Sequence, residues 1–194
     1  MRVLTKIWTL LLIAPLASSC GYNKMVSLDE AVTSQWAQVE NAYQRRADLI
    51  PNLVNTVKGA AETEKEILTQ VIEARSKATS TTIDANNLTP ENLARFQQAQ
   101  DALSSALSRL LVTVERYPDI KSNQNFLDLQ AQLEGTENRI SVERRKFIES
   151  VQSHNTYIRQ FPQLIYAGWF GFEKKGQFES APGADEAPEV DFGD

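Results

Sequence analysis

Few residues in this chain are of the types that carry out chemistry. Its single histidine, His154, and its single cysteine, Cys20, lie far apart in the sequence. One histidine is too few for a catalytic triad or a histidine-rich metal site. A carboxylate di-iron bundle would need Glu-x-x-His motifs on two helices, yet the residue three before His154 is Val151. The sequence also lacks a phosphate-binding glycine loop, a serine nucleophile elbow and a metalloprotease motif. We therefore predict no enzymatic activity, no cofactor and no metal site, and we expect His154 to be a polar or interfacial helix residue.

Two groups of polar residues stand beside apolar helical patterns. They are Arg45, Arg46 and Asp48, close before Pro51, and Glu137, Asn138 and Arg144 further along the chain. Glu137 and Arg144 are seven residues apart, which places them on one face of a helix. In one interpretation, Arg45 or Arg46 pairs with Glu137 in a buried or half-buried salt bridge that fixes the register of two helices. In the other, these residues line a groove that docks a partner. The sequence leaves both interpretations open.

Apolar residues at spacings of three and four predict that these side chains lie on long helices. Ser27 and Glu30 fit a capping box, so the first helix should begin there. Pro51 removes a backbone donor, so we expect the chain to kink sharply or reverse at that point and a second segment to run over about 52–78. The apolar stripe of the first helix consists of Leu28, Val32, Trp36, Val39, Tyr43 and Ile50.

Two further helices should follow a polar loop at 79–87. Thr89 as a cap and Pro90 at the first helical position predict the start of the third helix. Ser122 or Asn123 can cap the last one, which should end near residue 161. Their stripes consist of Leu93, Phe96, Leu103, Leu107, Leu110 and Val114, and of Phe126, Leu129, Leu133, Ile140, Phe147, Val151 and Ile158. No segment alternates strictly as a strand would. We therefore predict an all-α fold, an antiparallel four-helix bundle over 27–162.

The N-terminus has the features of a bacterial lipoprotein signal peptide. Arg2 and Lys6 precede an apolar run over 7–16, and small residues lead to Cys20. We predict that residues 1–19 are removed, that Cys20 carries the lipid, and that residues 20–26 form a membrane tether. The alternative is an uncleaved anchor helix, because the uncharged run is close to the minimum length of about 17 residues that spans a bilayer. The basic residues should stay in the cytoplasm, so the bundle should face the periplasm or the exterior.

The charge and the C-terminal composition narrow the choice of partners. The net charge of -5 makes the chain a poor candidate for binding nucleic acid. It also repels an anionic bilayer mildly, so residence at a membrane requires an anchor. Residues 163–178 are rich in aromatic residues and glycine, and should either pack over the bundle end or present an exposed apolar patch. Residues 179–194 contain acidic but no basic residues, which predicts a disordered tail.

Several motifs are too specific for a generic helix. The most informative is YQRRADLIPNLVNTVK at 43–58. Others are Tyr22-Asn23 with Val26, Tyr117-Pro118-Asp119-Ile120-Lys121, Thr136-Glu137-Asn138, and Phe161-Pro162 with Gly171-Phe172. In this order they resemble the LemA family of bacterial envelope proteins over about residues 22–178. The family's usual Tyr-Asn pairs near residues 153–157 are partly replaced, and the leader ends in a lipobox where the family usually has a longer membrane span.

This resemblance implies a helical bundle that is held by its N-terminus in the bacterial envelope. We expect a non-enzymatic, membrane-anchored scaffold or adaptor for membrane partners. One alternative is a structural protein that assembles into homo-oligomers at the membrane surface, and another is an accessory subunit of an envelope protease. The motifs identify neither the partner nor the membrane, inner or outer.

Overall fold

The computed structural model describes the backbone of residues 2–58 and 64–179, and the side chains of residues 21–58 and 64–179. Over these residues every regular element is a helix, so the predicted all-α class is confirmed. The four long helices are α1 (Arg2–Lys58), α2 (Lys65–Ser80), α3 (Pro90–Val114) and α5 (Gln124–Tyr157). Three short elements complete the described chain: α4 (Pro118–Lys121), α6 (Gln163–Tyr166) and the 3-10 turn η2 (Gly168–Phe170).

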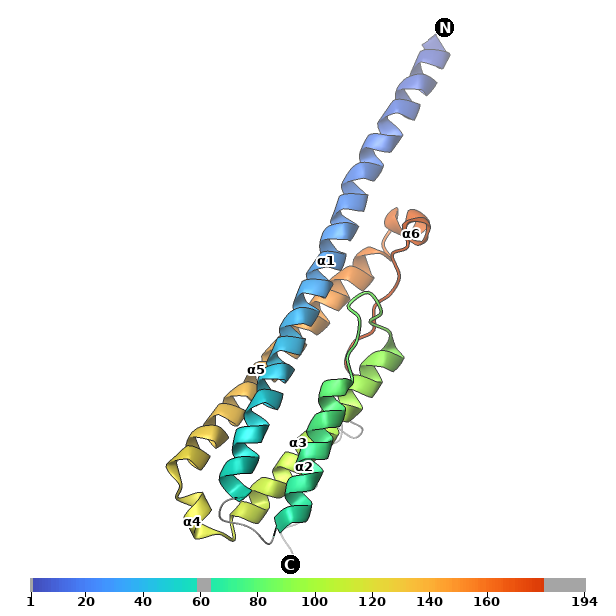
Figure 1. The fold of residues 1–194 in the computed structure, drawn as a ribbon. Coiled ribbons are helices and arrows are strands. Elements are labelled where there is room, and N and C mark those ends of the chain that lie inside the picture. Colours follow the sequence, from blue (N-terminus) through green and yellow to red (C-terminus); the bar gives the residue numbers. More distant parts are fainter. Residues whose placement is uncertain (1, 59–63, 180–194) are drawn as a thin grey trace, which may run out of the picture.

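The long helices pack mainly in pairs. α1 lies along α5, α2 lies along α3, and α2 also contacts α1 (Figure 1). Hydrogen bonds join Gln35 to Glu143 and Arg46 to Glu137, so residues later in α1 meet residues earlier in α5. The two helices therefore run antiparallel. At its N-terminal end α1 projects well beyond the other helices (Figure 1).

Two apolar clusters form most of the interior. One joins the C-terminal half of α1 to α2 and α3 and includes Leu53, Val71 and Leu110. The other is aromatic and centres on Trp36, which is fully buried and touches rings from α3, α5 and the C-terminal segment. The predicted stripes of the first, third and last helices are buried except for Leu28 and Leu129, which are half-buried. Burying each large apolar side chain contributes about 1.5–3 kcal/mol before the entropic cost of ordering it.

The predicted helix start at Ser27 is wrong, because α1 passes through this residue without interruption. Residues 20–26, expected to form a tether, are part of the same helix. Met25 is fully buried and packs against Ile158 and Ala167 from the other end of the chain. This tertiary packing on the N-terminal side of Ser27 stabilises helix where the local capping signal favoured a start.

The predicted reversal at Pro51, with a second segment that begins there, is wrong. α1 continues as a helix through Pro51 to Lys58, and α2 begins at Lys65 instead of near residue 52. A proline deprives the carbonyl four residues earlier, here that of Ala47, of its helical N–H donor. In this fold Arg75 of α2 donates its Nε–H to the Ala47 carbonyl oxygen at 2.7 Å. The tertiary hydrogen bond replaces the one that Pro51 removes, so the helix continues.

The predicted starts of α3 and α5 are confirmed. Thr89 caps α3, its Oγ1 accepting a hydrogen bond from the Asn92 backbone N–H at 3.2 Å, and Pro90 takes the first helical position. Asn123 caps α5, its Oδ1 accepting from the Asn125 N–H at 2.9 Å. Each cap satisfies a backbone donor that the helix itself leaves free.

The segment after α5 combines both behaviours expected of it. Residues 161–170 expose large apolar side chains, whereas residues 172–179 pack back over the long helices. There the Gly176 N–H donates to the Leu88 carbonyl at 2.7 Å, and Phe178 is buried beside Trp36.

The predicted leader and tail lie largely outside what the structure describes. The side chains of residues 1–20, including Cys20, and all of residues 180–194 are not among the described parts. Within residues 21–58 and 64–179, no helical stretch is long and apolar enough to cross a membrane.

Candidate functional site

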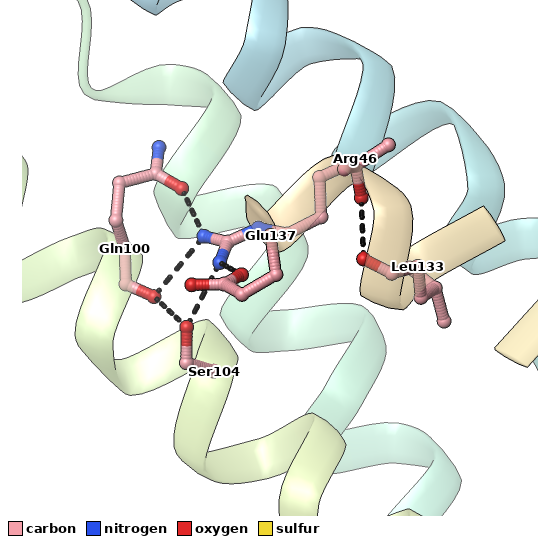
Figure 2. Close-up of polar contacts among 6 residues, drawn as sticks. Arg46, Gln100, Ser104, Leu133 and Glu137 are labelled. Atoms are coloured by element: carbon pink, nitrogen blue, oxygen red, sulfur yellow. Dashed lines mark hydrogen bonds and ion pairs between the residues drawn. The ribbon is translucent and has the colours of Figure 1, made fainter. Parts of the chain in front are cut away.

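Arg46 is the centre of a buried polar cluster between α1, α3 and α5 (Figure 2). Its side chain is only 3% exposed. Nη1 donates to Ser104 Oγ and to Glu137 Oε2, both at 2.9 Å. Nη2 donates to Gln100 Oε1 at 2.8 Å and to the Gln100 carbonyl at 3.3 Å. The pairing of Arg46 with Glu137 is the salt bridge that the sequence suggested between one of the two arginines and this carboxylate.

Gln100 extends the cluster to the fourth long helix. Its Nε2 donates to the carbonyl of Ala78 near the end of α2, at 3.3 Å. The Arg46 guanidinium also lies over the Tyr43 ring, with its central carbon 5.1 Å from the ring centroid. Because the guanidinium offers five N–H donors in a fixed fork, it orients several partners at once. The cluster therefore links all four long helices through two side chains, Arg46 and Gln100.

The ion pair itself is asymmetric in its hydration. The Glu137 side chain is 56% exposed, whereas Arg46 is almost fully buried. Water therefore weakens the attraction between the two charges, and much of the stabilisation of Arg46 must come from Gln100 and Ser104. These contacts join α1 to α3 and α5.

The other predicted site residues do not join this cluster. Arg45 and Asn138 are exposed. Asp48 is exposed as well and accepts a hydrogen bond from Gln44 one turn earlier. The Arg144 guanidinium lies over the ring of Phe178, with its central carbon 4.4 Å from the centroid. Of the six residues, the structure brings only Arg46 and Glu137 into contact through the cluster.

Two open grooves border the Arg46 cluster. The first, of about 310 Å³, lies between α3 and α5, and its lining combines Arg46 and Glu137 with apolar side chains such as Leu111. The second, of about 450 Å³, lies between α1 and α5 and is lined by Arg45, Arg139 and several amide side chains. Of the six predicted docking residues, Arg45, Arg46 and Glu137 line these grooves, whereas Asp48, Asn138 and Arg144 line neither.

His154 is fully buried, in contrast to the expected polar or interfacial position. Its Nδ1 lies 3.3 Å from Asn155 Oδ1, and its Nε2 lies 3.5 Å from Asp29 Oδ1 without hydrogen-bond geometry. Lys175 pairs with the same Asp29 oxygen at 2.9 Å and donates its backbone N–H to Asn155 Oδ1 at 2.9 Å. Burial lowers the pKa of His154, while Asn155 and Asp29 oppose that shift. The imidazole is thus buried against Asp29 of α1, and the neighbouring Asn155 makes the hydrogen bonds to the C-terminal segment.

Glu143 is a second buried charge that the sequence did not single out. Its Oε2 accepts a hydrogen bond from Gln35 Nε2 at 2.8 Å, and Lys146 Nζ lies 3.3 Å from both carboxylate oxygens. The Gln35 hydrogen bond, helped by Lys146 and Arg139, holds the pKa of Glu143 below its usual range. An ionised Glu143 therefore joins α1 to α5 two turns away from the Arg46 cluster.

One of these missed residues had a usable sequence signal. Gln100 lies four residues after Phe96 and three before Leu103, so it occupies a stripe position where an apolar residue was expected. A polar side chain at such a position needs a buried partner. Asp29, Gln35 and Lys175 lie outside the apolar stripes, so the sequence did not mark them for burial. Their side-chain partners are more than a hundred residues away in the chain. Within residues 21–58 and 64–179, no three His, Cys, Asp or Glu side chains are arranged to hold a metal ion.

Comparison with known proteins finds one matching family profile and several distant relatives. The sequence profile of the LemA family matches residues 35–192. Magnetosome protein MamQ 2 of Paramagnetospirillum magneticum is 24% identical over 185 residues, which covers 84% of this chain and 66% of that protein. Magnetosome protein MamQ of Magnetospirillum gryphiswaldense is 25% identical over the same coverage. Protein LemA of Metamycoplasma hominis is 21% identical over 147 residues, 76% of this chain and 60% of that protein. The chain therefore spans somewhat less than two thirds of the length of these relatives.

Proposed function

This chain belongs to the LemA family, and from that membership we propose that it is a non-enzymatic, membrane-anchored protein of the bacterial cell envelope that acts as a scaffold or adaptor for membrane partners. The N-terminal segment holds it to the membrane, through a lipid on Cys20 or as an anchor helix. The four long helices form an antiparallel bundle on the extracytoplasmic side, and its surface docks the partner.

The observation that carries this proposal is the continuity of α1. One helix runs from Arg2, in the predicted leader, to Lys58 inside the packed domain. A helix transmits position and orientation along its axis, whereas a flexible linker would not. A domain joined to its anchor in this way is held at a defined height above the membrane, which suits a protein that presents a surface to other membrane components.

The docking surface is proposed to be the face around Arg45 and Arg46. The Arg46 cluster fixes the helices on either side of two grooves, so the grooves keep their shape without a bound ligand. A preorganised groove binds with a smaller entropic cost than a mobile one. The groove beside Arg45 and Arg139 favours an acidic or amide-rich partner segment.

A second candidate function is self-assembly at the membrane surface. Val112 on α3 is 71% exposed, and the groove between α3 and α5 includes apolar side chains, so another copy of the chain could pack on this side. An accessory role in an envelope protease is a third candidate, for which the described residues offer no specific observation.

In-cell crosslinking of the tagged chain, followed by mass spectrometry of the co-purified proteins, tests the proposal. The experiment compares the wild type with Cys20→Ala and with the charge reversal Arg45→Glu. Arg95→Glu, an exposed arginine on α3, is the matched control. A scaffold or adaptor should give the same defined envelope partner with the wild type and the control, and lose it with Arg45→Glu. If only self-crosslinks appear, the self-assembly function replaces the adaptor.

A further inference from the structure

Residues 161–170 carry an unusual density of exposed apolar side chains, which we call the aromatic patch. Its members are Phe161 at 81% exposure, Leu164 at 61%, Ile165 at 54%, Trp169 at 81% and Phe170 at 57%. Elsewhere in the described chain, large apolar side chains with this degree of exposure are isolated single residues. Isolated exposure is ordinary, but a contiguous group in ten residues marks a surface that something covers.

The patch lies beside the point where α1 leaves the folded domain (Figure 1). The Tyr22 ring meets the rings of Phe170 and Phe172, with centroids 5.0 and 5.8 Å away. Tyr166 lies directly against Gly21, so close that a Cβ at this position would collide with its hydroxyl oxygen. Gly21 directly follows Cys20, the predicted lipid-bearing residue. The patch is therefore level with the start of the proposed anchor.

The backbone beneath the patch is held in place, so its side chains are not exposed through disorder. Ile158 and Ala167 are buried with Met25 in a small cluster of their own. The Phe172 N–H donates to the Ala167 carbonyl at 3.0 Å, which closes the turn around Gly171. Gly171 itself has a φ of +77°, a conformation that glycine adopts without strain. The fold thus presents these apolar groups outward.

The composition of the patch suits one kind of surface, the interfacial zone of a bilayer. Tryptophan and other aromatic rings favour this zone, where an apolar body and a polar edge are both satisfied. Exposed basic residues flank the patch in sequence, namely Arg159 and Lys174, and Lys24 lies two residues after Tyr22 on α1, although the whole chain is acidic. Basic side chains at this end match the anionic headgroups that the net charge would otherwise repel.

We propose that the aromatic patch inserts into the headgroup region of the same bilayer that holds the N-terminal segment, as a second membrane contact. This inference rests on the proposed membrane anchoring. With one anchor alone, the angle between the domain and the membrane normal can vary. A second contact beside it fixes the tilt, and with it the direction in which the grooves face.

The chain carries its own probes for a test. Its three tryptophans are Trp8 in the leader, Trp36 in the core and Trp169 in the patch. The unprocessed chain, which keeps residues 1–19 and therefore Trp8, is reconstituted in liposomes of phosphatidylcholine and phosphatidylglycerol, with or without bromine atoms near the top of the acyl chains. Subtracting the emission of Trp169→Phe from that of the wild type isolates the Trp169 signal. Subtraction of Trp8→Phe isolates that of the anchor.

We expect brominated lipid to quench the Trp169 signal at least twofold and aqueous iodide to leave it nearly unchanged. Circular dichroism of Trp169→Phe should match that of the wild type, because Trp169 is 81% exposed and supports no core. A Trp169 signal quenched by iodide but not by brominated lipid, with the Trp8 signal quenched by lipid, would overturn the inference and point to a protein as the cover of the patch. Loss of lipid quenching for both tryptophans would instead refute the anchoring.

Discussion

The guanidinium of Arg75 donates its Nε–H to the carbonyl oxygen of Ala47 at 2.7 Å. In a regular helix this carbonyl would accept from the N–H of residue 51, which Pro51 lacks. A side chain of α2 thus completes the backbone hydrogen bonding of α1. The contact explains how a 57-residue helix can contain an internal proline at this position. It also holds α2 against α1 at a defined position along the helix axis.

The first prediction concerns this contact. Arg75→Met should destabilise the fold by about 1.5–3 kcal/mol, the usual range for a hydrogen bond with a charged donor, because the Ala47 carbonyl loses its donor. Pro51→Ala restores a backbone N–H four residues after Ala47. In that background the cost of Arg75→Met should shrink by about 1 kcal/mol or more. Chemical unfolding followed by circular dichroism measures all four proteins, and equal costs in the two backgrounds would show that Arg75 acts through something other than the carbonyl.

The second prediction separates the two interpretations of the Arg46 cluster. Arg46→Met should destabilise the fold by about 2–4 kcal/mol, because Gln100 and Ser104 lose a buried partner. Glu137→Gln should cost only about 1 kcal/mol or less, because Glu137 is half-exposed and glutamine still accepts a hydrogen bond. Arg45→Met, at the exposed neighbouring position, should stay within about 0.5 kcal/mol of the wild type. Should Arg46→Met leave stability unchanged while partner recovery collapses, the register-fixing role would be wrong.

Much of the fold was predictable because helical periodicity is a local property. The stripes of α1, α3 and α5 follow from apolar residues at spacings of three and four, and the caps Thr89 and Asn123 from their own side chains. The errors at Ser27 and Pro51 share one cause. In both places a contact from a distant segment, Ile158 with Met25 and Arg75 with Ala47, outweighs the local signal.

The sequence predicted one contact of the candidate site, the pair formed by Arg46 and Glu137. A buried arginine needs an acceptor, so Arg46 and Glu137 could be paired from their positions beside apolar stripes. The choice between Arg45 and Arg46 was available from the spacing, because Arg46 lies three residues after Tyr43 and four before Ile50, on the apolar stripe, whereas Arg45 does not. The inward position of His154 could have been predicted, because it lies three residues after Val151 and four before Ile158 on the apolar stripe. The path of residues 172–179 could not, because nothing in the aromatic and glycine-rich composition of that segment specifies it.

The third prediction tests how the C-terminal segment is held. A Cβ at Gly176 would lie 2.7 Å from Pro90 N and 2.9 Å from the carbonyl carbon of Thr89, both backbone atoms that cannot move aside cheaply. Gly176→Ala should therefore break the hydrogen bond to Leu88 and release Phe178 from the aromatic cluster. Limited proteolysis should cut after Lys174 or Lys175 faster than in the wild type. Gly135→Ala is the control, since no atom lies within 4 Å of its Cβ position; it should stabilise α5 by about 0.5–1 kcal/mol.

The fourth prediction is a dependence of stability on pH through His154. Burial lowers its pKa in the folded state below the ordinary value of 6.5, while the unfolded chain takes up a proton near that value. Its contribution to the free energy of unfolding is therefore complete above pH 6.5. This contribution is lost as the pH falls from 6.5 to the lowered pKa of the folded state. His154→Gln should flatten the fall in the free energy of unfolding just below pH 6.5. Asp29 lies 3.5 Å from the His154 ring and pairs with Lys175. A slope that survives the substitution unchanged would assign the effect to other groups.

The fifth prediction decides between the two kinds of anchor at the N-terminus. If residues 1–19 are a lipoprotein signal peptide, the chain extracted from membranes should lack them and carry a diacylglyceryl group on Cys20, with or without a further acyl chain on its amino group. Cys20→Ala should then retain the leader, because lipid attachment to the cysteine precedes its removal. Intact-mass spectrometry distinguishes these forms directly. An unmodified mass that includes residues 1–19 would mean that α1 itself enters the bilayer, and the single helix from Arg2 to Lys58 would then be both the anchor and the first helix of the domain.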